Sequence, residues 1–113
     1  MKKEKIILGV ELDEKKVPSK LSWSSSDHPS GNHKEEAKAF LLSVFSKTQL
    51  ETLKIDLWTK EMQVTEMNQF FYNTLKGLAD TYKNATNNNE LASQIARFAQ
   101  FFGEETDILP RSS

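Results

Sequence analysis

The sequence contains no cysteine, only four glycines and three prolines, and no apolar run long enough to cross a membrane. The lack of cysteine excludes disulfides, thiolate metal sites and a cysteine nucleophile. The apolar run Ile6–Val10 spans five residues, whereas a signal peptide needs about 7–15 and a membrane span about 20. We therefore expect a cytoplasmic protein without direct membrane insertion.

Charge also limits the possible partners. Fifteen basic and sixteen acidic residues give a net charge of −1, without a long basic stripe. Nucleic acid would need such a stripe, so we expect no nucleic-acid partner. The 113 residues, 37% hydrophobic and 10% aromatic, are typical of a single folded domain, which we predict over 1–113.

Familiar catalytic motifs are absent. The four glycines are scattered, and neither a G-x-S-x-G elbow nor an H-E-x-x-H helix occurs. His28 and His33 lie near Glu35 and Glu36, but this loop lacks a recognisable metal-ligand spacing on a stiff frame. We therefore predict no catalytic residue, no cofactor and no metal site.

Alternating apolar residues predict strands in the first half of the chain, because a period of two places successive side chains on opposite faces. Ser24–Asn32 is rich in serine, proline, glycine and asparagine, which is typical of a loop. The expected strands lie at about 5–12, 20–25, 37–45 and 52–59, and the expected flexible loop at 24–33.

Ala37–Phe45 is the ambiguous segment. Ala37, Leu41 and Phe45 fit a helical stripe, whereas Phe40, Leu42 and Val44 fit one face of a strand. We predict a strand, because the polar break at Ser46–Gln49 allows a hairpin with the following strand. Such a strand would be apolar on both faces, which is typical of a central strand or of a subunit contact.

A period of 3.6 predicts two helices in the second half of the chain, at about 65–84 and 89–102. Thr65 and Asn89 are the expected N-caps, and Gly103 the expected residue after the second helix. A frayed tail is expected at about 107–113. The predicted fold is α+β: a four-stranded antiparallel β-meander, followed by two antiparallel α-helices packed on one face of the sheet.

Several short stretches resemble a known family. They are Val10-Glu11-Leu12-Asp13, Leu21-Ser22-Trp23, Glu36-Ala37-Lys38-Ala39, Gln69-Phe70-Phe71 and above all Thr52–Met62, TLKIDLWTKEM. Together they are similar to the gliding-motility-associated protein C (GldC) family of Bacteroidetes, from Ile6 to about Phe102. The resemblance implies an accessory or adaptor protein linked to the gliding machinery and its associated secretion system, and carries no catalytic residue to this chain.

Two other functions stay open at this point. One is a small-molecule-binding protein or small enzyme with a pocket between sheet and helices. The other is a chaperone-like holder of secretion substrates, which would use exposed apolar sheet surface.

The candidate interaction surface is the apolar set expected opposite the helix-covered face, together with Phe101 at the edge of the second helix. Trp58 either covers aliphatic stems on its own face or anchors an interface. Apolar residues on adjacent strands would form a patch that a small monomer rarely exposes, so a homodimer is expected. The residues are Ile7, Leu41, Phe45, Trp58 and Phe101.

Overall fold

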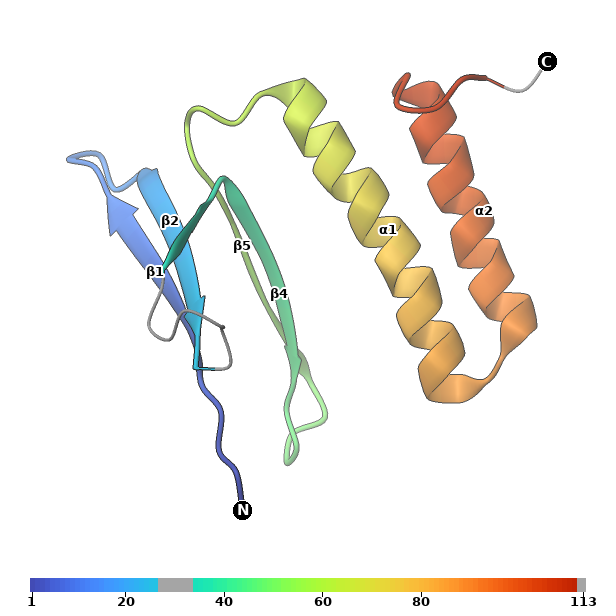
Figure 1. The fold of residues 1–113 in the computed structure, drawn as a ribbon, viewed down its shortest axis with the longest axis horizontal. Helices are drawn as coiled ribbons and strands as arrows, with labels where there is room; N and C mark the ends of the chain where they lie inside the picture. The colour runs from blue at the N-terminus through green and yellow to red at the C-terminus, as the bar shows by residue number, and fades with distance from the viewer. Residues whose placement is uncertain (27–33, 112–113) are drawn as a thin grey trace. The chain divides into compact units, whose positions relative to one another are not determined.

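The computed structural model describes residues 1–26 and 34–111, so His28 and His33 lie outside the described residues. The chain divides into two compact units, Met1–Met62 and Gln63–Ser113. Among the described residues, the first unit holds five antiparallel strands in two sheets, and the second holds two helices that contact each other. The predicted α+β class is confirmed (Figure 1).

The first sheet has the order β1 (Ile6–Leu12), β2 (Pro18–Ser25) and β3 (Glu35–Ala37). β1 and β2 form the predicted hairpin, in which Val10 lies opposite Leu21. Leu21 lies opposite Ala37 on its other side. These three apolar residues share one face, and Leu21 is fully buried. The alternation in the sequence therefore marks one apolar face of this sheet, on which Leu21 is buried and Val10 is 43% exposed.

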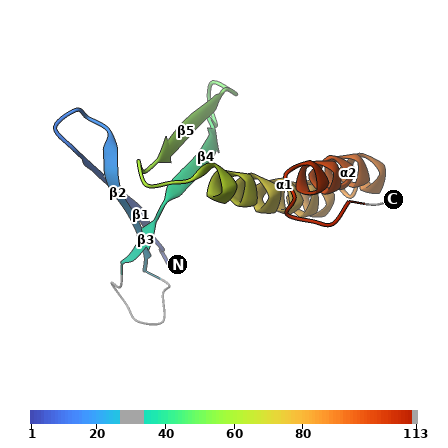
Figure 2. The same ribbon diagram turned by 90° about the horizontal axis from the view of Figure 1, so that it is seen from above.

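The predicted third strand is divided in two. β3 ends at Ala37, the chain bends at Lys38, and β4 (Ala39–Phe45) pairs with β5 (Thr52–Trp58) in a second sheet. The single four-stranded meander is therefore corrected to two sheets that separate from this bend (Figure 2). The backbone N–H of Thr59 donates to the Lys38 carbonyl at 2.9 Å, and its hydroxyl does so at 3.4 Å.

The strand alternative for Ala37–Phe45 is confirmed by the pairing of β4 with β5. The connecting turn is closed by the Ser46 N–H, which donates to the Glu51 carbonyl at 2.8 Å, and by the Leu50 N–H, which donates to the Ser46 carbonyl at 3.1 Å. Leu50 has a φ of 55°, a left-handed conformation that favours glycine and asparagine over leucine.

The helices are longer than predicted: α1 spans Val64–Thr86 and α2 spans Asn89–Glu105. The N-cap of α1 is Gln63, not Thr65, in a capping box where the Gln63 N–H donates to the Glu66 carboxylate at 2.9 Å. The N-cap of α2 is Asn88, not Asn89; its side-chain oxygen accepts from the Leu91 N–H at 3.0 Å. Asn87 ends α1 with a φ of 58°.

Small residues bring the two helices together as an antiparallel pair (Figure 1). Ala79 of α1 and both Ala92 and Ala99 of α2 are buried, so little side chain separates the two backbones. Tyr72 supplies the large buried side chain at the other end of the contact. The buried residues lie seven positions apart in α1, and seven and then four positions apart in α2, where Gly103 is the third, which is typical of antiparallel helix pairs.

Gly103 is not the residue after α2 but lies inside it and is buried. A Cβ at this position would lie 2.8 Å from Tyr72 Cε1 and 2.8 Å from Leu109 Cδ1. The N–H groups of Ile108 and Leu109 donate to the Gly103 carbonyl at 2.9 and 3.0 Å. The segment after α2 therefore turns back over the helix. Gly103 lies inside α2, and its lack of a side chain leaves room for Leu109.

Candidate interaction surface

The register of β4 and β5 assigns their side chains to two faces. Phe40 lies opposite Leu57, Leu42 opposite Ile55 and Val44 opposite Leu53, so one face is apolar throughout. This agrees with the alternation predicted for both strands. We call this set, Phe40, Leu42, Val44, Leu53, Ile55 and Leu57, the aliphatic face.

The opposite face of the same two strands is mixed. Leu41 lies opposite Asp56, Phe45 opposite Thr52 and Trp58 opposite Ala39. The side chains of Leu41, Phe45 and Trp58 are 40%, 66% and 53% exposed. Lys54 and Asp56 form an exposed ion pair between these residues, with Nζ 3.8 Å from Oδ2. We call this set, Leu41, Phe45, Lys54, Asp56 and Trp58, the mixed face.

A shallow hollow of about 230 Å³ adjoins Trp58. Val17 and Pro18, at the start of β2, line it on one side, and Asp56–Trp58 of β5 line it on the other. An aromatic side chain beside a hollow is a common arrangement for anchoring a protein partner, because tryptophan contributes strongly to interface energies. The mixed face thus joins exposed apolar side chains, a charged pair of both signs and a recess.

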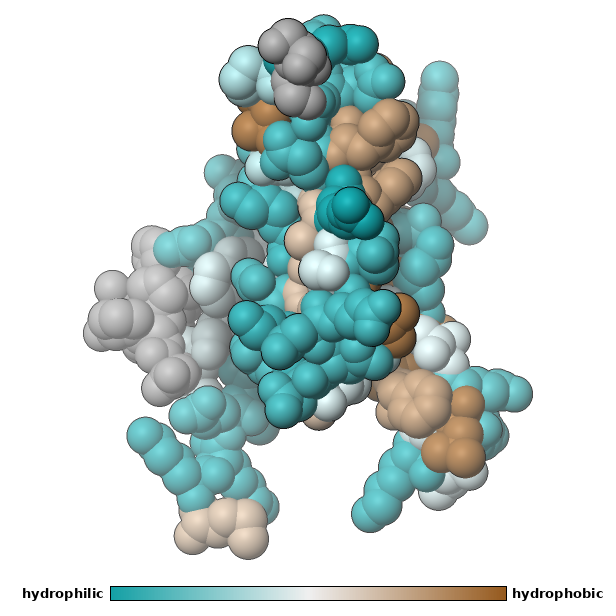
Figure 3. All heavy atoms as spheres, turned by 90° about the vertical axis from the view of Figure 1, so that its right-hand side faces the viewer, coloured by the Kyte–Doolittle hydropathy of each residue, from teal (hydrophilic) through white to brown (hydrophobic). Residues whose placement is uncertain are grey.

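Ile7 and Phe101, the other two residues of the predicted surface, lie on other elements than β4 and β5. Ile7 lies on β1, opposite Ser24, in the other sheet of the strand unit. Phe101 lies on α2 in the helical unit, with its ring centroid 6.0 Å from that of Phe98. On the α2 side shown in Figure 3, hydrophilic side chains predominate and apolar ones gather in separate groups. Within the strand unit, the predicted surface is thus divided between the two sheets, while Phe101 belongs to the helical unit.

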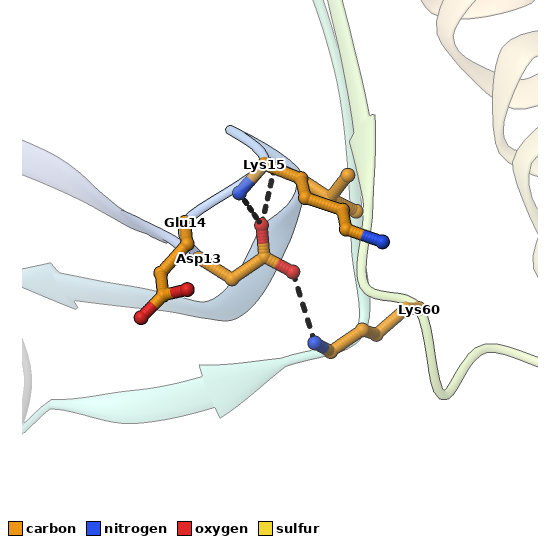
Figure 4. Close-up of a pocket in the computed structure, with 5 residues that line it drawn as sticks. Asp13, Glu14, Lys15 and Lys60 are labelled. Carbon is orange, nitrogen blue, oxygen red and sulfur yellow. Dashed lines mark hydrogen bonds and ion pairs between the residues drawn. The ribbon is translucent and has the colours of Figure 1, made fainter.

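A polar junction ties the β1–β2 turn to the end of β5 (Figure 4). Asp13 Oδ1 accepts the backbone N–H groups of Lys15 at 2.8 Å and Val17 at 3.0 Å. Asp13 Oδ2 accepts from Lys60 Nζ at 2.9 Å. The donated N–H of Val17, then Lys60 and the N–H of Lys15, lower the pKa of Asp13 below its ordinary value, because they stabilise the carboxylate.

This junction joins the β1–β2 turn to Lys60, just after β5, through one carboxylate. Asp13 accepts from two N–H groups of the turn and from Lys60, and the carboxylate is ionised at neutral pH. Aspartate at the start of a turn is a recognisable sequence signal, but the contribution of Lys60, remote in sequence, is not. Within 1–26 and 34–111, no cluster of three or more metal-ligating side chains occurs.

Comparison with known proteins decides the family. Residues 18–108 match the family described as gliding motility-associated protein GldC-like. The chain belongs to this family. The GldC-like match starts at β2, so β1 lies outside it. No curated protein and no solved structure matches the chain. In the part of the chain that the structure describes, neither helix is long and apolar enough to span a membrane.

Proposed function

We propose that the protein is a non-catalytic, cytoplasmic accessory or adaptor of the gliding-motility apparatus and its associated secretion machinery, acting through protein–protein contacts. The observation that carries this proposal is the mixed face, where Leu41, Phe45 and Trp58 extend from two paired strands into solvent. Exposed apolar side chains with polar ones around them are characteristic of protein-binding surfaces. Membership in the GldC-like family supplies the process.

The proposal assigns the aliphatic face a different role from that of the mixed face. The helical unit has an apolar flank of its own, where the rings of Phe71 and Phe102 stack at 6.3 Å between centroids. Phe98, on the same flank, is half exposed and lies 6.5 Å from Phe102. The aliphatic face and this flank are therefore kept out of the partner-binding surface, which the proposal limits to the mixed face.

The experiment is a replacement in a gliding cell. The double variant Phe45→Ser, Trp58→Ala removes two exposed side chains, so we expect it to fold normally. Leu50→Asn is the matched control, because Leu50 is equally exposed on the same hairpin and asparagine suits its φ of 55°. Gliding speed and the proteins cross-linked to each variant are measured at equal expression.

We expect the double variant to reduce gliding and to lose a cross-linked component that wild type and Leu50→Asn retain. Interface anchors typically contribute about 2 kcal/mol or more each, so loss of two weakens binding about a thousandfold. Full gliding and an unchanged cross-linking pattern in the folded double variant would contradict the proposal.

A further inference from the structure

β1 is an edge strand with unused hydrogen-bonding groups. Within the described residues, β1 pairs with β2 alone (Figure 1). The Ser26 N–H donates to the Lys5 carbonyl at 3.0 Å, so the backbone of Lys5 points toward β2. Because these groups alternate along a strand, the N–H and C=O groups of Ile6, Leu8 and Val10 point to the open edge.

The central part of this edge, Ile6–Val10, lacks the usual protection against strand pairing. Natural edge strands carry proline, lysine, a bulge or an inward charge, whereas Ile6–Val10 is regular and uncharged. The bulge comes only after Glu11. Ile6 and Ile7 are 73% and 59% exposed, so apolar side chains flank the open edge on both faces. A strand of this kind needs a partner strand.

The sequence of β1 complements itself when two copies run antiparallel with Leu8 opposite Leu8. Ile6 then lies opposite Val10 of the second copy, and these outward-pointing residues can exchange hydrogen bonds in both directions. Lys5 lies opposite Glu11 of the second copy, which places opposite charges together at each end. Centring on Gly9 instead would place Ile7 opposite Glu11, an unfavourable apolar–charged pair.

Size matching supports the same register. In it, Ile7 lies opposite Gly9 of the second copy, so the exposed apolar side chain on that face meets the residue without one. A Cβ added at Gly9 would lie 2.6 Å from Ser22 Oγ, so Ser22 would have to turn away. The exposed side chains of Lys5 and Glu11 lie on this same face, at the two ends of the strand.

We propose that a second copy of this chain binds at the open edge of β1, so that two three-stranded sheets join into one through antiparallel β1–β1 pairing centred on Leu8. A second copy fits this edge because the charges and side-chain sizes of β1 complement each other in this register. The inference goes beyond the proposed partner binding, which uses the mixed face of β4 and β5. The dimer contact uses instead the open edge of β1, a strand outside the family match.

The first test reverses charges. Lys5→Glu and Glu11→Lys each place like charges opposite one another at both ends of the pairing, and the double variant restores attraction. Sedimentation velocity across micromolar concentrations should show dimers for wild type and for the double variant. Each single variant should dimerise about tenfold more weakly, since cross-strand charge pairs change the energy by modest amounts.

Lys54→Glu is the matched control, because it makes the same change of charge on β5, where Lys54 is also exposed. It should leave the dimer intact. If Lys54→Glu dissociates the dimer while Lys5→Glu does not, the contact lies at β5 and the proposal is wrong. A wild-type chain that stays monomeric throughout this range would equally overturn it.

The second test blocks the edge with proline. Ile6→Pro removes an outward N–H at the first residue of an edge strand, where proline is tolerated. It should be a folded monomer, while Ile6→Ala should remain dimeric. A dimeric Ile6→Pro variant would contradict the proposal. These edge variants should retain the partner cross-link of the mixed face, so failure of the dimer and failure of the adaptor function give different results.

Discussion

The helix pair and the β4–β5 pair both carry many apolar residues but bury them very differently. In α1 and α2, Ala79, Ala92 and Ala99 are buried between the helices, and the N-terminus of each helix has a side-chain cap. In β4 and β5, no side chain is fully buried. The helical unit closes a contact with its own residues, whereas the second sheet presents apolar side chains on both of its faces.

This difference teaches where to look for function. A folded chain rarely maintains several large apolar side chains in water unless another surface covers them. Ion pairs such as Lys54–Asp56 keep such a face soluble while leaving the neighbouring Phe45 and Trp58 available. The region that buries least by itself is therefore the region where we place the partner.

The largest expected effect is at Leu21, a fully buried apolar residue of the strand unit. Leu21→Ala should lower the free energy of unfolding by about 2–5 kcal/mol, because it removes buried surface and leaves a cavity. Phe45→Ala, on the exposed mixed face, should change it by less than about 0.5 kcal/mol. Urea denaturation of the isolated variants measures both. Equal losses would remove the contrast between buried and partner-binding apolar residues.

Two glycines give a sharper comparison inside the helical unit. Gly103→Ala should destabilise the protein by about 1–3 kcal/mol, because the new Cβ would collide with Tyr72 and Leu109. Gly77→Ala, with no atom within 4 Å of the new Cβ, should instead stabilise α1 by about 0.5–1 kcal/mol. Thermal unfolding followed by circular dichroism distinguishes the opposite signs. A stabilised Gly103→Ala variant would contradict the close packing around Gly103.

Much of this fold follows from sequence patterns, because apolar residues recur with a period of two in the strands and of about 3.6 in the helices. The bend at Lys38 does not, since no glycine or proline marks it. It is held by Thr59, which is remote in sequence, and it lies beside the buried Leu21. The continuation of α2 past Gly103 does not follow from sequence patterns either. The need for glycine there becomes clear only from the contact with Leu109, in the segment that turns back.

The candidate surface was less predictable than the fold. Leu41, Phe45 and Trp58 were recognisable because they alternate with the aliphatic face. The alternation also groups Ile7 with them, but Ile7 lies in the other sheet of the strand unit. A period of two assigns a residue to a face of its own strand, and it does not reveal where one sheet ends and the next begins.

A smaller effect is expected at the start of α2. Asn88→Ala removes the side-chain oxygen that accepts the Leu91 N–H and should cost about 1 kcal/mol. Asn89→Ala is the control, because Asn89 lies one residue inside the helix, and it should change the free energy of unfolding by less than about 0.5 kcal/mol. The urea midpoints of the two variants are compared. A larger loss of stability in Asn89→Ala than in Asn88→Ala would show that Asn89 is the N-cap.

The smallest effect concerns the exposed junction at Asp13. Its folded-state pKa is lowered, so the carboxylate contributes stability above its unfolded pKa of about 4, and this contribution is lost as pH falls through the folded pKa. Wild type should therefore be more stable than Asp13→Asn at pH 7, and the difference should shrink on acidification below about pH 4. Unfolding midpoints across this range, with Glu14→Gln as control, provide the measurement. A difference independent of pH would show that the ionised carboxylate contributes nothing.

The most direct measurement is site-specific photo-crosslinking in gliding cells. A photoreactive residue is placed at Phe45 on the mixed face and, in a separate variant, at Asn73, an exposed polar position on α1. The account predicts a discrete adduct with another protein at position 45, removed by Trp58→Ala, and no such adduct at position 73. Identical adducts at both positions, or none at position 45, would contradict a partner-binding role for the β4–β5 strands.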